Sequence, residues 1–259
     1  MSLSPWLLRP PGGGPETLRL FCFPYAGGGG SGYMGWARQV PRGLGVWAVQ
    51  LPGRENRLRE RPLTEMPEIL EAALEAMRPH LDVPFALFGH SMGALVAFEF
   101  ARHLRRVGET APVRLLVSAQ RAPGLPRRRP PIAHLPSAEF VVELRRRYAG
   151  VPEAILQQPD LMALFLPCLQ ADMGLVERYR CDDEPALDCP ISAFGGTEDP
   201  EATEAELAAW QGHTRSTFSL RRFAGGHFYL RDAARELLAA MCRDLDGSGD
   251  PLPSVALPR

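Results

Sequence analysis

The stretch LFGHSMGALVAF, residues 87–98, places Ser91 between Gly89 and Gly93, directly after a run of apolar residues. A G-x-S-x-G pattern between a strand and a helix is typical of a nucleophile elbow, a tight turn that exposes a serine hydroxyl at the edge of a sheet. Strand and helix pack so closely at such a turn that only small residues fit two positions either side of the serine. Ser91 is therefore a candidate nucleophile, and a turn serine without a chemical role is the alternative.

The segments around this turn alternate between short apolar runs and amphipathic stretches. Apolar runs with almost no polar residues predict strands buried on both faces, and apolar residues at helical spacing predict helices between them. We therefore expect an α/β fold with a mostly parallel central sheet and helices on both faces. The expected strands cover residues 18–23, 45–51, 84–89, 113–120, 190–196 and 216–223, and the expected helices cover 64–77 (capped by Thr64), 92–108, 201–211 and 229–245.

The alternation stops after residue 120. A connector rich in arginine and proline follows, and the chain then reads as helices only up to residue 180, which predicts a helical lid inserted into the core. The ends of the chain are rich in Pro and Gly and have no apolar periodicity. We expect a flexible N-terminal arm (1–15), a core (16–120 and 186–245), a helical lid (121–185) and a disordered tail (246–259).

The composition excludes several kinds of chemistry. All 29 Lys+Arg residues are arginines, so a Schiff-base lysine or a P-loop lysine is excluded. A net charge of -1 gives no general attraction to nucleic acid or to anionic membranes. Five scattered cysteines form no CxxC pair and predict no zinc site, and a Cys181–Cys189 pair in an oxidising setting is a disfavoured alternative. With no signal peptide or membrane-length apolar run, we expect a cytoplasmic protein. We also expect it to be a monomer.

A nucleophilic serine needs a base and an acid. His227, in FAGGHFYL, follows the strand over 216–223 and precedes the last helix, which places it at the same sheet edge as Ser91. Asp199, in FGGTEDP, follows the strand over 190–196 and is the candidate acid, with Glu198 beside it as the rival. The chain order serine, acid, histidine is that of the nucleophile-elbow enzymes. A surface-loop histidine is the alternative for His227.

Two backbone N–H groups should stabilise the oxyanion that forms when a serine attacks a carbonyl. One is expected from Met92, directly after the nucleophile, and the other from Ala26, with Gly27 as the alternative. Both of the latter lie in PYAGGGG, residues 24–30, where glycines let the backbone approach a substrate closely. A phosphate-binding role of these glycines is disfavoured, because no acidic residue follows the next strand at the required place.

With these residues in place, the chain resembles the type II thioesterases, stand-alone α/β-hydrolases that accompany polyketide synthases and nonribosomal peptide synthetases. It is also similar to the medium-chain acyl thioesterases of animal fatty acid synthase. One departure is Ala149, where relatives more often carry glycine at a hinge of the lid. The resemblance rests on LFCFPYAGGGGSGYMGW, VQLPGRENRLRE, FALFGHSMGALVAFEFAR, LPSAEFVVELRRRYAGVP, LFLPCLQADMGLVERYR, ISAFGGTEDP and FAGGHFYL.

The resemblance implies a serine hydrolase that removes acyl groups from the phosphopantetheine arm of acyl or peptidyl carrier proteins, an editing role in biosynthesis. It implies catalytic roles for Ser91, Asp199 and His227, a mobile helical lid, and no metal or cofactor. The alternatives are another esterase or acyltransferase of this fold, a fatty acyl-carrier-protein thioesterase, and a hydrolase-like binding protein without catalysis.

Lid residues are candidates for the lining of an acyl channel, although lid core is the alternative for each. Because carrier proteins are acidic, the arginine runs 127–129 and 145–147 are candidates for docking, with a solvated charged face as the alternative. The channel candidates are Phe140, Leu144, Phe165, Leu166 and Met173.

Overall fold

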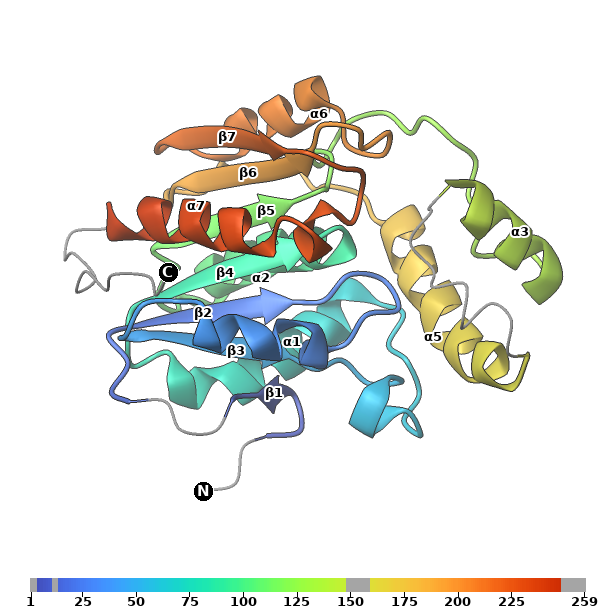
Figure 1. The fold of residues 1–259 in the computed structure, drawn as a ribbon, viewed down its shortest axis with the longest axis horizontal. Coiled ribbons are helices and arrows are strands. Elements are labelled where there is room, and N and C mark those ends of the chain that lie inside the picture. Colours follow the sequence, from blue (N-terminus) through green and yellow to red (C-terminus); the bar gives the residue numbers. More distant parts are fainter. Residues whose placement is uncertain (1–3, 11–13, 148–158, 248–259) are drawn as a thin grey trace.

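In the computed structural model, which describes residues 4–10, 14–147 and 159–247, the described strands form one seven-stranded sheet (Figure 1). Its order is β1-β3-β2-β4-β5-β6-β7, and every neighbouring pair except β1 with β3 is parallel. The predicted α/β fold with a mostly parallel sheet is confirmed. The strands are β1 (Leu7–Leu8), β2 (Leu18–Phe23), β3 (Leu44–Val49), β4 (Phe85–His90), β5 (Arg114–Ser118), β6 (Ile191–Gly196) and β7 (Phe218–Phe223).

The short strand β1 lies within residues 1–15, for which a flexible arm was predicted, and places Leu7 and Leu8 in the sheet. Leu7 pairs with Val49 and Leu8 with Ala48 in antiparallel register, and Leu7 is buried. This pairing covers the free edge of β3, which would otherwise expose unpaired N–H and C=O groups. Two residues are too few for a visible period of two, so the Pro- and Gly-rich surroundings hid the strand from the sequence.

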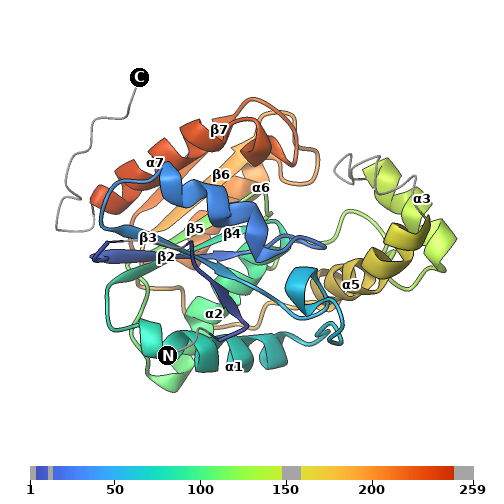
Figure 2. The same ribbon diagram turned by 60° about the horizontal axis from the view of Figure 1, so that its bottom comes forward.

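Helices cover both faces of the sheet (Figure 2). One face packs against α1 and α2, whose apolar residues form a single cluster with the sheet. The 3₁₀ helix of residues Gly30–Arg38 and helix α7 cover the other face through a second cluster. Because both faces are covered, the central strands are apolar at nearly every position. The core helices are α1 (Met66–Met77), α2 (Met92–Val107), α6 (Glu204–Ala208) and α7 (Ala234–Asp246).

Helix boundaries differ from the predictions at both ends of the core. Helix α1 begins at Met66 with Glu65 as its N-cap, so the cap predicted at Thr64 is wrong. The helix expected over 229–245 is divided into a 3₁₀ turn, Tyr229–Arg231, and α7. Helix α2 ends as predicted before Gly108, which has a φ of 75° and is a left-handed C-cap.

Two helices of the inserted segment lie beyond the carboxyl ends of the strands, at the right of Figure 1. They are α3 (Ser137–Arg147) and α5 (Pro159–Arg178), and both belong to the stretch 121–185 predicted as a lid. They share a small apolar cluster separate from those of the sheet. Ala149, where a hinge difference was expected, lies outside the described residues, as do residues 248–259 of the predicted tail.

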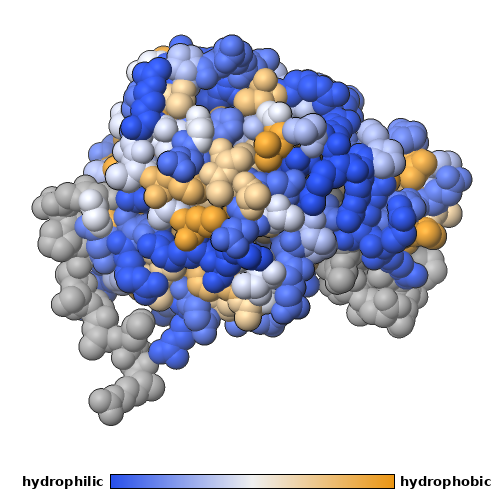
Figure 3. All heavy atoms as spheres, turned by 90° about the horizontal axis from the view of Figure 1, so that it is seen from above, coloured by the Kyte–Doolittle hydropathy of each residue, from blue (hydrophilic) through white to orange (hydrophobic). Residues whose placement is uncertain are grey.

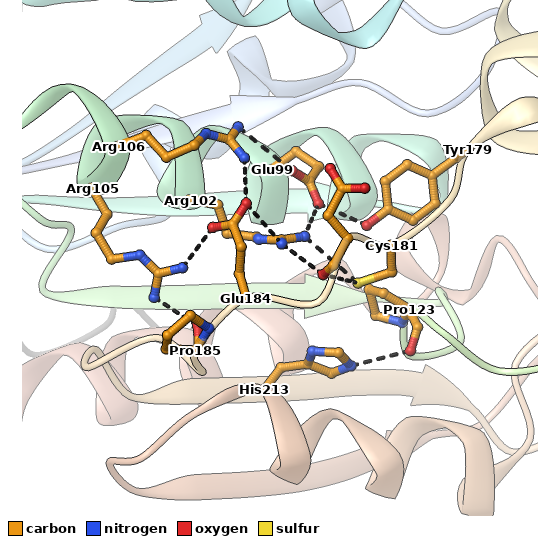
Figure 4. Close-up of polar contacts among 11 residues, drawn as sticks. Glu99, Arg102, Arg105, Arg106, Pro123, Tyr179, Cys181, Glu184, Pro185 and His213 are labelled. Carbon is orange, nitrogen blue, oxygen red and sulfur yellow. Dashed lines mark hydrogen bonds and ion pairs between the residues drawn. The ribbon is translucent and has the colours of Figure 1, made fainter.

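The segment that leads from the lid back to the sheet, residues 179–184, is held against α2 by ion pairs and hydrogen bonds (Figure 4). The Arg102 guanidinium donates to the Glu99 carboxylate at 2.6 Å and to the carbonyl oxygen of Asp182 at 2.8 Å. The Tyr179 hydroxyl donates to Glu99 at 2.7 Å, and Glu184 accepts from Arg102 at 3.0 Å. Arg102 and Glu99 are buried, so this side of the lid is held to the helix that starts at the serine turn. Within the described residues no helix has the length and apolarity needed to cross a membrane.

Candidate active site

Ser91 stands at the turn between β4 and α2 with a φ of 53° and a ψ of −122°, a strained conformation for a residue other than glycine. Gly89 and Gly93, two positions either side of Ser91, must be glycines because there is no room for a side chain at either position. A Cβ added at Gly89 would lie 2.0 Å from the carbonyl oxygen of Gly93, and one added at Gly93 would lie 2.2 Å from that of Phe23. The turn is therefore a nucleophile elbow, as the sequence predicted, and it presents Ser91 at the carboxyl edge of the sheet.

The structure brings the predicted base and acid to this serine. Nε2 of His227 lies 3.0 Å from the Ser91 Oγ, and Nδ1 of His227 lies 2.9 Å from Oδ2 of Asp199. A carboxylate can only accept, so Nδ1 carries the proton and Nε2 is left as the acceptor for the serine hydroxyl. Asp199 is buried, whereas its rival Glu198 is exposed, so the structure brings Asp199 and not Glu198 to the histidine.

The loops that carry the acid and the histidine touch through glycines. A Cβ added at Gly196, the last residue of β6, would lie 2.3 Å from the carbonyl oxygens of both Gly225 and Gly226. Gly225 has a φ of 112°, a left-handed conformation that glycine adopts without strain. The Glu198 N–H also donates to the Gly225 carbonyl at 2.9 Å. The glycine pairs in FGGTEDP and FAGGHFYL thus allow the two loops to pack backbone to backbone.

A buried polar chain supports the elbow from behind. Nδ1 of His90 lies 2.9 Å from the Ser118 Oγ, which lies 2.7 Å from the Tyr229 hydroxyl. The Ser118 carbonyl also accepts from the Ser91 N–H at 2.8 Å. Burial lowers the pKa of His90 well below its ordinary value, so this histidine is neutral in the folded protein. Sequence reasoning missed Ser118, which lies in no quoted motif, and Tyr229, which lies in FAGGHFYL but has no signal there for a contact with Ser118.

The structure distinguishes between the two candidate donors of the glycine loop. The Gly27 N–H already donates to Oδ2 of Asp172, a residue of α5, at 2.7 Å. Ala26 and Met92 both line the cavity in front of Ser91, and Met92 is the first residue of α2. Ala26 therefore remains the candidate donor from this loop, and Met92 lies at the helix N-terminus, where N–H groups lack partners within the helix.

The cavity in front of Ser91 has a volume of about 270 Å³ and is mostly apolar. Of the five lid residues predicted to line a channel, Leu144, Phe165 and Met173 do so. Phe140 and Leu166 pack in the lid cluster instead, so the prediction places these two wrongly. The α5 residues that line the cavity follow one helical face with steps of three or four residues: Met162, Phe165, Leu169, Met173 and Val176. This spacing is the signal that could have found the three that were missed, Met162, Leu169 and Val176.

A second groove, of about 500 Å³, adjoins this cavity. The two share Gln120, Arg121, Met173, Val176 and Glu201. Figure 3 shows hydrophilic surface between the core and the lid, on the side of the molecule where the connector runs. The arginines that line the groove outnumber its two carboxylates, Glu177 and Glu201, so the groove is basic. These arginines are Arg121, Arg127, Arg128, Arg129, Arg147 and Arg180.

Comparisons with known proteins agree with this geometry. The model of the Thioesterase domain family matches residues 18–245. The chain is 40% identical over 240 residues to the gramicidin S biosynthesis protein GrsT of Aneurinibacillus migulanus, covering 93% of each chain.

Two solved structures are also similar. RedJ, a thioesterase from the prodiginine pathway of Streptomyces coelicolor, superposes with a TM-score of 0.81 at 41% identity, covering 87% of this chain and 89% of RedJ. BorB, a type II thioesterase from the borrelidin biosynthetic cluster, superposes with a TM-score of 0.83 at 36% identity, covering 95% of this chain and 98% of BorB. These structures have the same fold as this chain over almost its whole length.

Proposed function

The chain belongs to the thioesterase domain family and has the α/β-hydrolase fold, and on this premise we propose that it is a type II thioesterase that hydrolyses acyl groups from carrier proteins. The observation that carries the proposal is the line of three side chains, with 3.0 Å between Ser91 and His227 and 2.9 Å between His227 and Asp199. Its role is editing: it releases stalled acyl groups so that a polyketide or nonribosomal peptide assembly line continues.

In the first half of the reaction, the Ser91 Oγ attacks the thioester carbonyl while Nε2 of His227 takes the hydroxyl proton. Asp199 holds the imidazole orientation and stabilises the imidazolium that forms. The negative charge on the carbonyl oxygen is met by the N–H groups of Ala26 and Met92. Collapse of the tetrahedral intermediate breaks the C–S bond, and the thiol leaves with the proton from His227.

In the second half, a water molecule replaces the thiol. Nε2 of His227 removes a proton from the water as it attacks the Ser91 ester, and returns that proton to Oγ when the acid is released. A simple thiol has a pKa near 8.5, so it is a better leaving group than an alcohol. Every group that moves a proton or meets charge belongs to this chain, so the proposed reaction needs neither metal nor cofactor.

The basic groove supports an acidic carrier protein as the partner, because opposite charges attract. The groove also adjoins the cavity at Ser91, so it could hold the anionic phosphopantetheine arm that carries the acyl group. We also propose a cytoplasmic location, which the five scattered cysteines support because their spacing forms no disulfide framework.

The test is release of an acyl group from a loaded carrier protein, followed by intact-mass spectrometry. The unaltered chain should remove the acyl mass, and Ser91→Ala should lower kcat by a factor on the order of 10⁶ while the protein stays folded. An aryl ester and an acyl-pantetheine thioester in the same series separate a thioesterase from a general esterase. Unchanged turnover by the alanine variant, or a strong preference for the aryl ester, would contradict the proposal.

A further inference from the structure

Asp172 is a buried charge on lid helix α5, and its carboxylate reaches two other parts of the chain. Oδ2 accepts from the Gly27 N–H at 2.7 Å and from Nη1 of Arg54 at 2.7 Å, and Oδ1 accepts from Nη2 of Arg54 at 2.9 Å. Asp172 is 1% exposed and Arg54 is 2% exposed. Burying two charges is costly, and apolar residues of equal size often replace such a pair without loss of stability. Stability alone therefore does not account for this pair.

The glycine loop is held at several points by the same group of residues. Nη1 of Arg54 donates to the Gly28 carbonyl at 3.1 Å. The Gly30 N–H donates to Oε1 of Gln50 at 2.6 Å, and Nε2 of Gln50 donates to the Arg54 carbonyl at 3.1 Å. These contacts fix the orientation of successive peptide groups in the loop. The Gly27 N–H is held by the carboxylate, and the preceding residue, Ala26, lines the cavity.

We propose that Asp172 is a positioning residue for acyl transfer: by holding the Gly27 N–H it fixes the Ala26–Gly27 peptide group, which adjoins the Tyr25–Ala26 peptide group whose N–H meets the oxyanion. Arg54 neutralises a carboxylate whose charge would otherwise oppose the developing negative charge on the substrate. The inference rests on the proposed function. It also makes the oxyanion site depend on the lid, because Asp172 belongs to α5 and not to the sheet.

The test compares two double variants of the full chain, Arg54→Met/Asp172→Leu and Arg54→Met/Asp172→Asn. Both remove the two charges, and Leu and Asn have nearly the same shape, but only Asn keeps an oxygen that can accept from the Gly27 N–H. We expect kcat on an acyl-pantetheine thioester to fall about 10²- to 10³-fold in the Leu variant, the effect of losing one oxyanion donor, with KM within about threefold. The Asn variant should recover at least about tenfold of that loss.

A control removes a partly buried ion pair away from the cavity. Arg221→Met/Asp244→Leu replaces the pair between β7 and α7, where the Asp244 carboxylate accepts at 2.5 and 2.6 Å, and should leave kcat within about twofold. If the double variants are destabilised, kcat is compared at a temperature below both of their unfolding midpoints, which urea and thermal unfolding establish. Equal kcat values for the Leu and Asn variants would overturn the positioning role. Failure of the proposed function is a separate outcome, seen as undiminished hydrolysis by Ser91→Ala.

Discussion

Nδ1 of His227 lies 2.9 Å from Oδ2 of Asp199, although the two residues are 28 positions apart in the chain. They meet because β6 and β7 are parallel neighbours whose carboxyl ends open at the same edge of the sheet. The second carboxylate oxygen of Asp199 accepts the Glu201 N–H at 2.8 Å, so the carboxylate is held from both sides. The imidazole therefore has one defined tautomer and orientation.

The first prediction concerns this contact. In Asp199→Asn the amide N–H can face Nδ1, which would place the imidazole proton on Nε2, where it cannot accept from Ser91. We expect kcat to fall about 10⁴-fold with little change in folding. Thioester hydrolysis and circular dichroism measure the two effects. Glu198→Gln, at the exposed neighbour, should keep full activity, and an equal loss in both variants would refute the assignment of Asp199.

The second prediction concerns acyl length. Val176→Phe adds volume to a cavity of about 270 Å³, so long acyl groups should lose room while an acetyl group does not. A hydrophobic pocket distinguishes neighbouring chain lengths by about 10- to 200-fold, and we expect kcat/KM for the longest accepted thioester to fall by about tenfold or more. Phe165→Ala should shift the preference toward longer chains. An unaltered chain-length profile in both variants would show that the acyl group binds elsewhere.

The third prediction concerns the two arginine runs. Arg127 lines the basic groove and Arg145 lies on α3, and both are exposed. Because opposite charges speed encounter, Arg127→Glu should lower kcat/KM for a loaded carrier protein about tenfold at low salt and leave the acyl-pantetheine thioester unaffected. Arg145→Glu tests the other run in the same way, and Arg42→Glu, in the loop before β3, is the control. If the two arginine runs form only a solvated face without a partner, the three variants should have equal kcat/KM values for the loaded carrier protein.

The fourth prediction follows from the lowered pKa of His90, whose main cause is burial. The unfolded chain binds a proton at His90 near pH 6.5 and the folded chain does not, so this contribution to stability is full above that pH and decreases below it. The free energy of unfolding should fall by up to about 1.4 kcal/mol per pH unit from this residue alone. His90→Asn should reduce the slope between pH 7.5 and 5.5 in urea unfolding. The exposed His134→Asn should keep the original slope, and identical slopes in all three proteins would contradict the prediction.

The fifth prediction concerns the anchor of the lid return. Arg102→Met leaves the Glu99 carboxylate buried without its main partner, which should cost about 3–5 kcal/mol in the free energy of unfolding. Arg105→Met removes a half-exposed pair with Glu184 and should cost about 1 kcal/mol or less. Urea unfolding compares the two, and equal losses would show that the burial of Arg102 is not what matters.

Much of this arrangement could be predicted from local patterns. The apolar runs predicted β2 to β7, and the strand ends predicted the edge at which Ser91, Asp199 and His227 lie. Each of these signals is contained within about ten residues of sequence, so it can be recognised without knowledge of the rest of the fold.

The features that could not be predicted depend on distant partners. Asp172 and Arg54 are 118 positions apart, and neither lies in a pattern that announces a buried ion pair. Phe140 and Leu144 both have helical spacing, but only the packing of α3 on α5 decides that Leu144 lines the cavity and Phe140 does not. The pairing of Leu7 and Leu8 with β3 likewise exists only once the sheet has formed.

The contact between Gly196 and the Gly225 carbonyl leaves no room for even one methyl group. The loops that carry Asp199 and His227 are consequently packed together as one rigid unit, whatever the position of the lid helices. Their alignment is established when the chain folds, so each catalytic cycle starts from an imidazole that is already oriented.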